Sequence, residues 1–214
     1  MKIAAFTEGG YTGVVPRNHS NMRTDMAWWC ALDAVHHPIL HLPSMKDNEY
    51  DVGIMILPKN RKQLIGLPIL EEYKRVCKKV TIMQESYYNY WQDSSIEEQI
   101  WYFNFITEMD LIFCHNDVDL KYYNGLTNVR TELLPSLMIT DDIVKRNEWG
   151  DGVIIGGNFV WAYGGFDSYQ VATEITDDVT AVTTGRMKPE EKDVLKHIPW
   201  VLWKDWINIL SQFN

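Results

Sequence analysis

The sequence predicts an α/β protein with a doubly wound, mostly parallel, Rossmann-like sheet, followed by a small, incomplete second βα unit. Continuous apolar runs alternate with segments of helical spacing about five times before residue 135. Such runs are typical of strands covered on both faces, and the alternation indicates parallel strands joined by crossover helices. A strand that runs into paired glycines also occurs twice, at Gly9-Gly10 and at Gly156-Gly157.

Composition narrows the class of protein. Hydrophobic residues make up 46% of the 214 residues, enough for a sizeable core. The net charge of −9 argues against an extended nucleic-acid-binding surface, but it allows a local basic pocket for one diphosphate. The three cysteines form no Cys-x-x-Cys pair and are expected to be buried reduced thiols. There is no signal peptide and no apolar run of membrane-spanning length, so we expect a soluble cytoplasmic protein without a membrane partner.

The first thirty residues predict the main ligand site. Residues 1–6 form a buried strand, residues 7–13 a glycine-rich turn, and residues 22–35 a helix. Ligands of open α/β sheets bind at the carboxyl ends of the strands, where Gly9, Gly10 and Gly13 would let a ligand approach the backbone. Free amides near the helix start would favour an anion. The spacing is neither a dinucleotide fingerprint nor a Walker motif, so a tight β–α connection without a ligand remains the alternative.

The remaining elements of the first domain follow the same alternation. We expect strands at 39–42, 52–57, 80–83 and 109–114, and helices at 68–79, from Ser94 or Ser95 to Thr107, and through Tyr122 to a stop at Gly125. The inward stripe of the helix after Ser95 is expected at Ile96, Ile100, Phe103 and Thr107. The pair His36-His37 is expected to end the first helix. No acidic or cysteine ligand stands at a recognisable spacing from it, which argues against a metal site.

Two further segments invite a functional interpretation. The aromatic residues of segment 87–91 follow a predicted strand end and could stack on a base or a sugar, or cover the core instead. The aromatic-rich helix expected at 199–213 could pack on the first domain or form a homodimer contact.

The chain divides into three parts on this pattern. Residues 1–134 are predicted to form a Rossmann-like domain, residues 135–150 a polar linker, and residues 151–214 a partial second domain. In this second part a helix is expected near 167–175 and a strand at 179–183. Its 64 residues are fewer than such a domain usually needs, so we expect either an incomplete domain or an appendage of the first one.

The residues at both glycine turns resemble a known family. Residues 1–13, MKIAAFTEGGYTG, look like the start of GT-B glycosyltransferases, especially those encoded by bacteriophages, and residues 153–159 look like the opening of their second domain. The resemblance implies an acceptor site on the first domain, a nucleotide-sugar donor site on the second and no required metal. Modified bases of DNA are among the acceptors it implies. The family's ribose-binding acidic residue and donor helix would lie beyond residue 214, so the donor site is expected to be incomplete.

Sugar transfer needs a base near the acceptor hydroxyl and positive charge near the leaving diphosphate. The candidate bases stand at predicted strand ends: Glu8, Glu85 and His115. The candidate diphosphate-binding residues are Gly9, Gly10, Gly13, Arg17, Arg23, Gly156, Gly157 and Arg186. Glu8 could instead hold backbone amides of the turn, and Glu85 and His115 could be polar caps. The arginines could be solvated or paired with carboxylates on the surface.

Three functions remain open on the sequence. A glycosyltransferase that uses a nucleotide-sugar is favoured. The alternative is a non-catalytic binding module, or a truncated glycosyltransferase domain, that lacks a complete donor site. The third is another doubly wound nucleotide-binding enzyme. Among such enzymes a dehydrogenase is disfavoured, because Asp33 lies within the predicted helix rather than at a strand end, where a ribose-binding acid is needed.

Overall fold

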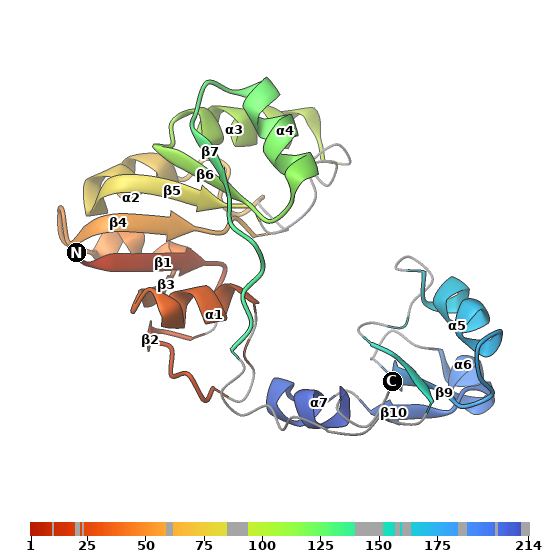
Figure 1. Ribbon diagram of the computed structural model, residues 1–214. Helices are drawn as coiled ribbons and strands as arrows, with labels where there is room; N and C mark the ends of the chain where they lie inside the picture. Colours follow the sequence, from red (N-terminus) through yellow and green to blue (C-terminus); the bar gives the residue numbers. More distant parts are fainter. Residues whose placement is uncertain are drawn as a thin grey trace. The chain divides into compact units, whose positions relative to one another are not determined.

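The computed structural model describes residues 1–9, 11–19, 22, 24–58, 62–84, 94–139, 152–156, 159, 164–183, 188–199 and 201–210. The chain forms two compact units. Unit 1 comprises residues 1–19 and 24–138, and unit 2 comprises residues 20–23 and 139–214. Both units are α/β (Figure 1).

Unit 1 is built on a seven-stranded, mostly parallel sheet, and the predicted α/β class is confirmed. Its strand order is β2-β3-β1-β4-β5-β6-β7, and only the β2–β3 pair is antiparallel. The strands are β1 (Ile3–Thr7), β2 (Gly13–Val14), β3 (Val35–Pro38), β4 (Tyr50–Met55), β5 (Cys77–Met83), β6 (Leu111–Cys114) and β7 (Thr131–Leu133). This arrangement is compatible with a Rossmann-like fold.

The order of the strands creates a topological switch point. From β1 the chain moves to β3 on one side, and it then returns to β4 on the other side of β1. The backbone amide of Ile56 donates to the carbonyl of Phe6 over 2.9 Å, so the ends of β4 and β1 lie side by side. In open α/β sheets a ligand crevice lies at such a point, outside the carboxyl ends of the two strands.

Helices cover both faces of this sheet. They are α1 (Thr24–Ala31), the 3-10 helix η1 (Ile39–Ser44), α2 (Ile69–Val76), α3 (Ile96–Thr107) and α4 (Asp117–Leu126). Residues of η1, α2, α3 and α4 share one buried cluster with Ala4 and Phe6 of β1, and no residue of α1 belongs to it. Because alternate residues of a strand face opposite sides, α1 covers the other face, where Figure 1 shows it in front of the strands.

The segment after α1 differs from the prediction. His36 and His37 do not end a helix: they lie within β3, in register with Ala5 and Phe6 of β1. The strand expected at 39–42 is instead part of η1, where Ile39 and Leu42 are buried. Pairing with β1 determines this outcome, and the local apolar pattern could not reveal it.

The predicted start of α3 is confirmed, but the side of the helix that is buried differs from the prediction. Ser95 is the N-cap, and it forms a reciprocal capping box with Glu98. The predicted inward stripe is wrong, because Ile96 and Ile100 are 72% and 56% exposed. The buried side chains of α3 are Glu98, Tyr102, Phe105 and Ile106. The helix is apolar over more than one stripe, and packing on the sheet decides which one is buried.

Two other helices end at positions that the sequence did not indicate. Helix α2 stops at Val76, and Lys78 and Lys79 stand in β5, where they form ion pairs with Asp51 and Asp110. Gly125 does not terminate α4 but lies inside its last turn. The basic side chains beside α2 are therefore paired with carboxylates.

Unit 2 contains a smaller, fully parallel sheet in the order β10-β9-β8. Its elements are β8 (Val153–Ile155), α5 (Gly165–Thr173), β9 (Val179–Thr183), α6 (Pro189–Val194), β10 (His197–Pro199) and α7 (Trp203–Leu210). Strand β9 was predicted, whereas α6 and β10 were not. The helix expected at 199–213 begins only at Trp203, because Pro199 belongs to β10. The buried core of the unit contains Phe159, Ala181 and Leu195.

All three cysteines are free and buried, as predicted. Burial raises the pKa of Cys77 and of Cys114 to about 12, so both thiols stay protonated at neutral pH. None of the described helices is long and apolar enough to cross a membrane.

Candidate functional site

The glycine turn after β1 is held by a buried histidine. His36 is 5% exposed; its Nε2 lies 2.8 Å from the Thr7 hydroxyl, and its Nδ1 contacts the carbonyl of Tyr11. A carbonyl only accepts, so Nδ1 carries a proton. The Thr7 hydroxyl also lies 3.1 Å from the carbonyl of Gly9. His36 therefore ties the start of the turn to its far side.

This turn does not sit at a helix start as expected. After Gly13 the chain forms β2, and α1 begins only at Thr24, so the free amides of α1 are not part of the glycine turn. Gly9 and Gly13 have φ values of +156° and +109°, and a Cβ on either would meet nothing within 4 Å. Glycine is required there by the backbone conformation, and the space around both residues is open.

His115 stands at the carboxyl end of β6, as predicted. Its Nδ1 lies 2.6 Å from the carbonyl oxygen of Leu134, which can only accept, so Nδ1 carries a proton; in the neutral ring Nε2 then holds a lone pair. Nε2 has no hydrogen-bond partner among the described residues. A half-buried imidazole with a fixed tautomer and a free Nε2 has the form of a general base.

The carbonyl that holds His115 belongs to a segment that we name the strap, residues 134–138. Figure 1 shows the chain leaving β7 and running past the carboxyl ends of the strands toward α1. The strap begins with a bond from the Leu134 amide to the carbonyl of Cys114, 2.7 Å long. Its next carbonyl, of Pro135, accepts from the indole Nε1 of Trp28 in α1 over 3.0 Å.

Glu8 and His115 follow strands that are not neighbours in the sheet. Strands β1 and β6 are three positions apart in the sheet, which places their axes about 14 Å apart. A general base must lie within about 3.2 Å of the atom whose proton it takes. Glu8 is exposed and has no partner among the described residues, so nothing in this part of the chain orients it. The two residues are alternatives, and His115 is the oriented one.

A buried polar network lies at the end of β5. Tyr102 of α3 donates to the side-chain oxygen of Gln84 over 2.6 Å, and its hydroxyl lies 2.8 Å from that of Tyr123 of α4. The network ties the end of β5 to the two helices. Glu85, the next residue, lies outside the described residues, as does the aromatic segment 87–91.

Only some of the residues that were expected to bind a diphosphate lie in the described part of the chain. Arg17 lies in an exposed turn closed by a bond from the His19 amide to the Pro16 carbonyl, 3.0 Å long. Its charge lowers the pKa of Cys30, although burial, the larger effect, raises it. Gly10, Arg23, Gly157 and Arg186 lie outside the described residues.

A basic segment that was not among the predicted site residues follows β4 in the sequence. It contains Lys59, Arg61 and Lys62; Lys62 is exposed, whereas Lys59 and Arg61 lie outside the described residues. The signal was available, since three basic residues in four positions stand immediately after a continuous apolar run. Its importance depends on the strand order, because that order places the end of β4 beside β1.

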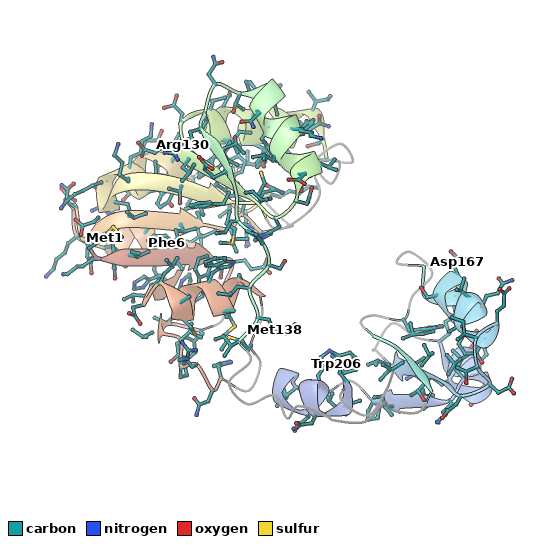
Figure 2. The ribbon with its side chains drawn as sticks, in the orientation of Figure 1. Met1, Phe6, Arg130, Met138, Asp167 and Trp206 are labelled. Atoms are coloured by element: carbon teal, nitrogen blue, oxygen red, sulfur yellow. The ribbon has the colours of Figure 1, made fainter. Side chains whose placement is uncertain are left out.

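In unit 2, Gly156 follows β8 as expected, and an aromatic ring lies against it. A Cβ at Gly156 would lie 2.9 Å from Cζ2 of Trp206 in α7, which is labelled in Figure 2, closer than real Cβ contacts allow. The glycine therefore lets the indole pack against the backbone at the carboxyl end of β8. A half-buried tryptophan at this edge can form a packed wall or a stacking surface for a base.

The histidines of β3 are accounted for by protein contacts. His37 Nε2 lies 2.8 Å from the Tyr50 hydroxyl, and its ring stacks on Phe6. Burial lowers the pKa of His37, which favours its neutral form. Within the described part of the chain, no group of three or more His, Cys, Asp or Glu side chains is arranged to hold a metal ion.

Comparisons of the chain with protein-family models, with curated proteins and with solved structures found no match.

Proposed function

We propose that the protein is a GT-B-type glycosyltransferase that moves a sugar from a nucleotide-sugar to an acceptor hydroxyl. The observation that carries the proposal is the presence of two α/β units in one chain, each with a parallel or mostly parallel sheet. In each unit the first parallel strand is followed within two residues by a glycine, Gly9 after β1 and Gly156 after β8. This agrees with the resemblance of residues 1–13 and 153–159 to the openings of the two GT-B domains. The nucleotide-sugar is the donor substrate, and no other cofactor is required.

In this proposal His115 is the base. Its Nε2 removes the proton of the acceptor hydroxyl as the oxygen attacks the anomeric carbon of the sugar. The bond from that carbon to the diphosphate breaks, and the nucleoside diphosphate leaves with the electron pair. Positive charge on Arg17, Arg23 or Arg186 would stabilise the leaving group. Glu8 and Glu85 are the alternative bases.

The acceptor in this proposal binds unit 1, with modified DNA bases among the candidates. A strand of nucleic acid brings phosphates, which the basic segment after β4 could neutralise. The net charge of −9 limits such binding to that local site. A host cytoplasm would be the compartment if the gene is viral.

The test starts with binding. A panel of nucleoside diphosphates and nucleotide-sugars is screened by thermal shift, since a ligand that binds only the folded state raises the melting temperature. Release of nucleoside diphosphate is then measured with hydroxymethylated DNA as acceptor. If no nucleotide binds at millimolar concentration, the transferase proposal fails.

Two variants separate the candidate bases. His115→Asn keeps an N–H that can reach the Leu134 carbonyl but removes Nε2, so turnover should fall about 10²- to 10⁴-fold while nucleotide binding is unchanged. Glu8→Gln is the matched control and should change turnover only slightly. The reverse result would assign the base to Glu8.

A non-catalytic, acceptor-binding module is the second candidate, and the contact between Trp206 and Gly156 favours it. The indole packs where a donor diphosphate would approach the backbone at the end of β8. This candidate expects binding of DNA without binding of any nucleotide and without turnover.

A further inference from the structure

The strap is fastened on both sides of a single proline. The carbonyl of Leu134 accepts from His115, and the next carbonyl, of Pro135, accepts from Trp28. Among the described residues, the bond from Trp28 is the only hydrogen bond made by residues 135–138. Pro135, Ser136 and Met138 are exposed, and Leu137 is half-buried.

The proline couples the two carbonyls mechanically. The peptide bond between Leu134 and Pro135 is planar, so the Leu134 carbonyl lies in one plane with the proline nitrogen. The pyrrolidine ring fixes φ of Pro135 near −65°. Only ψ of Pro135 is left as a soft torsion between the two carbonyl groups. Holding the Pro135 carbonyl therefore restricts the direction of the Leu134 carbonyl.

The direction of that carbonyl determines which nitrogen of His115 is free. While it accepts from Nδ1, the proton stays on Nδ1 and the lone pair stays on Nε2. If the Leu134 carbonyl turned away, the proton could move to Nε2, and the ring would have no fixed orientation.

We propose that Trp28 is a positioning residue that acts through the strap to hold His115 in its Nδ1–H tautomer. The role of His115 as a base rests on the proposed function, but its tautomer does not. Trp28 belongs to α1 and His115 follows β6, so the strap connects two distant parts of unit 1.

The tautomer is measured on the full chain by nitrogen-15 NMR of the histidine side chains, at a pH where the ring of His115 is neutral. The wild type should show protonated Nδ1 and unprotonated Nε2. Trp28→Phe removes the indole donor, and the tautomer ratio should move toward Nε2–H by about fivefold, as expected for the loss of one net hydrogen bond.

The neighbouring tryptophan supplies a matched control. Trp29 is fully buried in the same helix, and its indole nitrogen has no hydrogen-bond partner among the described residues. Trp29→Phe therefore perturbs α1 without removing a hydrogen bond to the strap, and it should leave the tautomer of His115 unchanged. Equal shifts in both variants would show that only the general packing of α1 matters, and would overturn the proposal.

A second variant keeps the test decisive if Trp28→Phe fails to fold. Pro135 is exposed, and Pro135→Gly frees φ between the two carbonyls without altering the core. It should also move the ratio toward Nε2–H. An unchanged tautomer in Pro135→Gly overturns the proposal.

If nucleotide-sugar turnover is found, Trp28→Phe should lower kcat and leave KM for the donor unchanged. If none is found, the tautomer result stands while the proposed function fails.

Discussion

Gly53 in the middle of β4 leaves room for the buried ring of Tyr73, and its replacement by alanine should destabilise unit 1 strongly. A Cβ at Gly53 would lie 2.4 Å from Cε2 of Tyr73, 2.7 Å from Sγ of Cys77 and 2.9 Å from the Tyr73 hydroxyl. Tyr73 is completely buried, and its hydroxyl donates to the carbonyl of Thr81 over 2.8 Å. Overpacking costs about 1–3 kcal/mol and the lost hydrogen bond about 1 kcal/mol, so we expect a loss of about 2–4 kcal/mol.

Hydrogen exchange at the amides of β4 and β5 is measured at increasing urea concentrations. Because these amides belong to unit 1, the exchange rates give the free energy of unfolding of unit 1 separately from that of unit 2. Gly125→Ala is the matched control. Its Cβ would meet nothing within 4 Å inside α4, and it should stabilise the helix by about 0.5–1 kcal/mol. In a Tyr73→Leu background the cost of Gly53→Ala should shrink. A cost below about 1 kcal/mol in the wild-type background would refute the packing argument.

Three other predictions concern the stability of the fold and the burial of the cysteines. Ser95→Ala removes the side-chain acceptor of the capping box and should lower the free energy of unfolding by about 1 kcal/mol, whereas Ser95→Thr should retain it. Burial raises the pKa of Asp110, but hydrogen bonds from Lys79 and from the Val80 amide outweigh this and lower it below the ordinary value. The carboxylate therefore stabilises the fold above about pH 4 and loses this effect as the pH falls further, so Asp110→Asn should flatten acid unfolding below that pH. The three cysteines should resist alkylation at pH 8 in the native chain and react fully in urea, and fast labelling of the native chain would contradict their burial.

Much of the fold could be predicted because local patterns specify it. Strands β1 and β4 contain short continuous apolar runs, which suit positions covered on both faces, and β9 is rich in β-branched residues. The start of α3 follows from Ser95 and Glu98 three residues apart, since the capping box is formed within one helical turn. The position of His115 at a strand end also follows from the pattern alone.

Tertiary structure decided what depends on distant partners. The sequence could not choose between the stripes of α3, because both contain large apolar residues and the sheet selects Tyr102 and Phe105 over Ile100. His36 lies in a strand because β1 offers a pairing edge. The tautomer of His115 depends on a carbonyl 19 residues away, and the separation of Glu8 from His115 depends on strand order. Local sequence thus determined the types of most elements, whereas the arrangement of the candidate site arose from contacts between residues far apart in the chain.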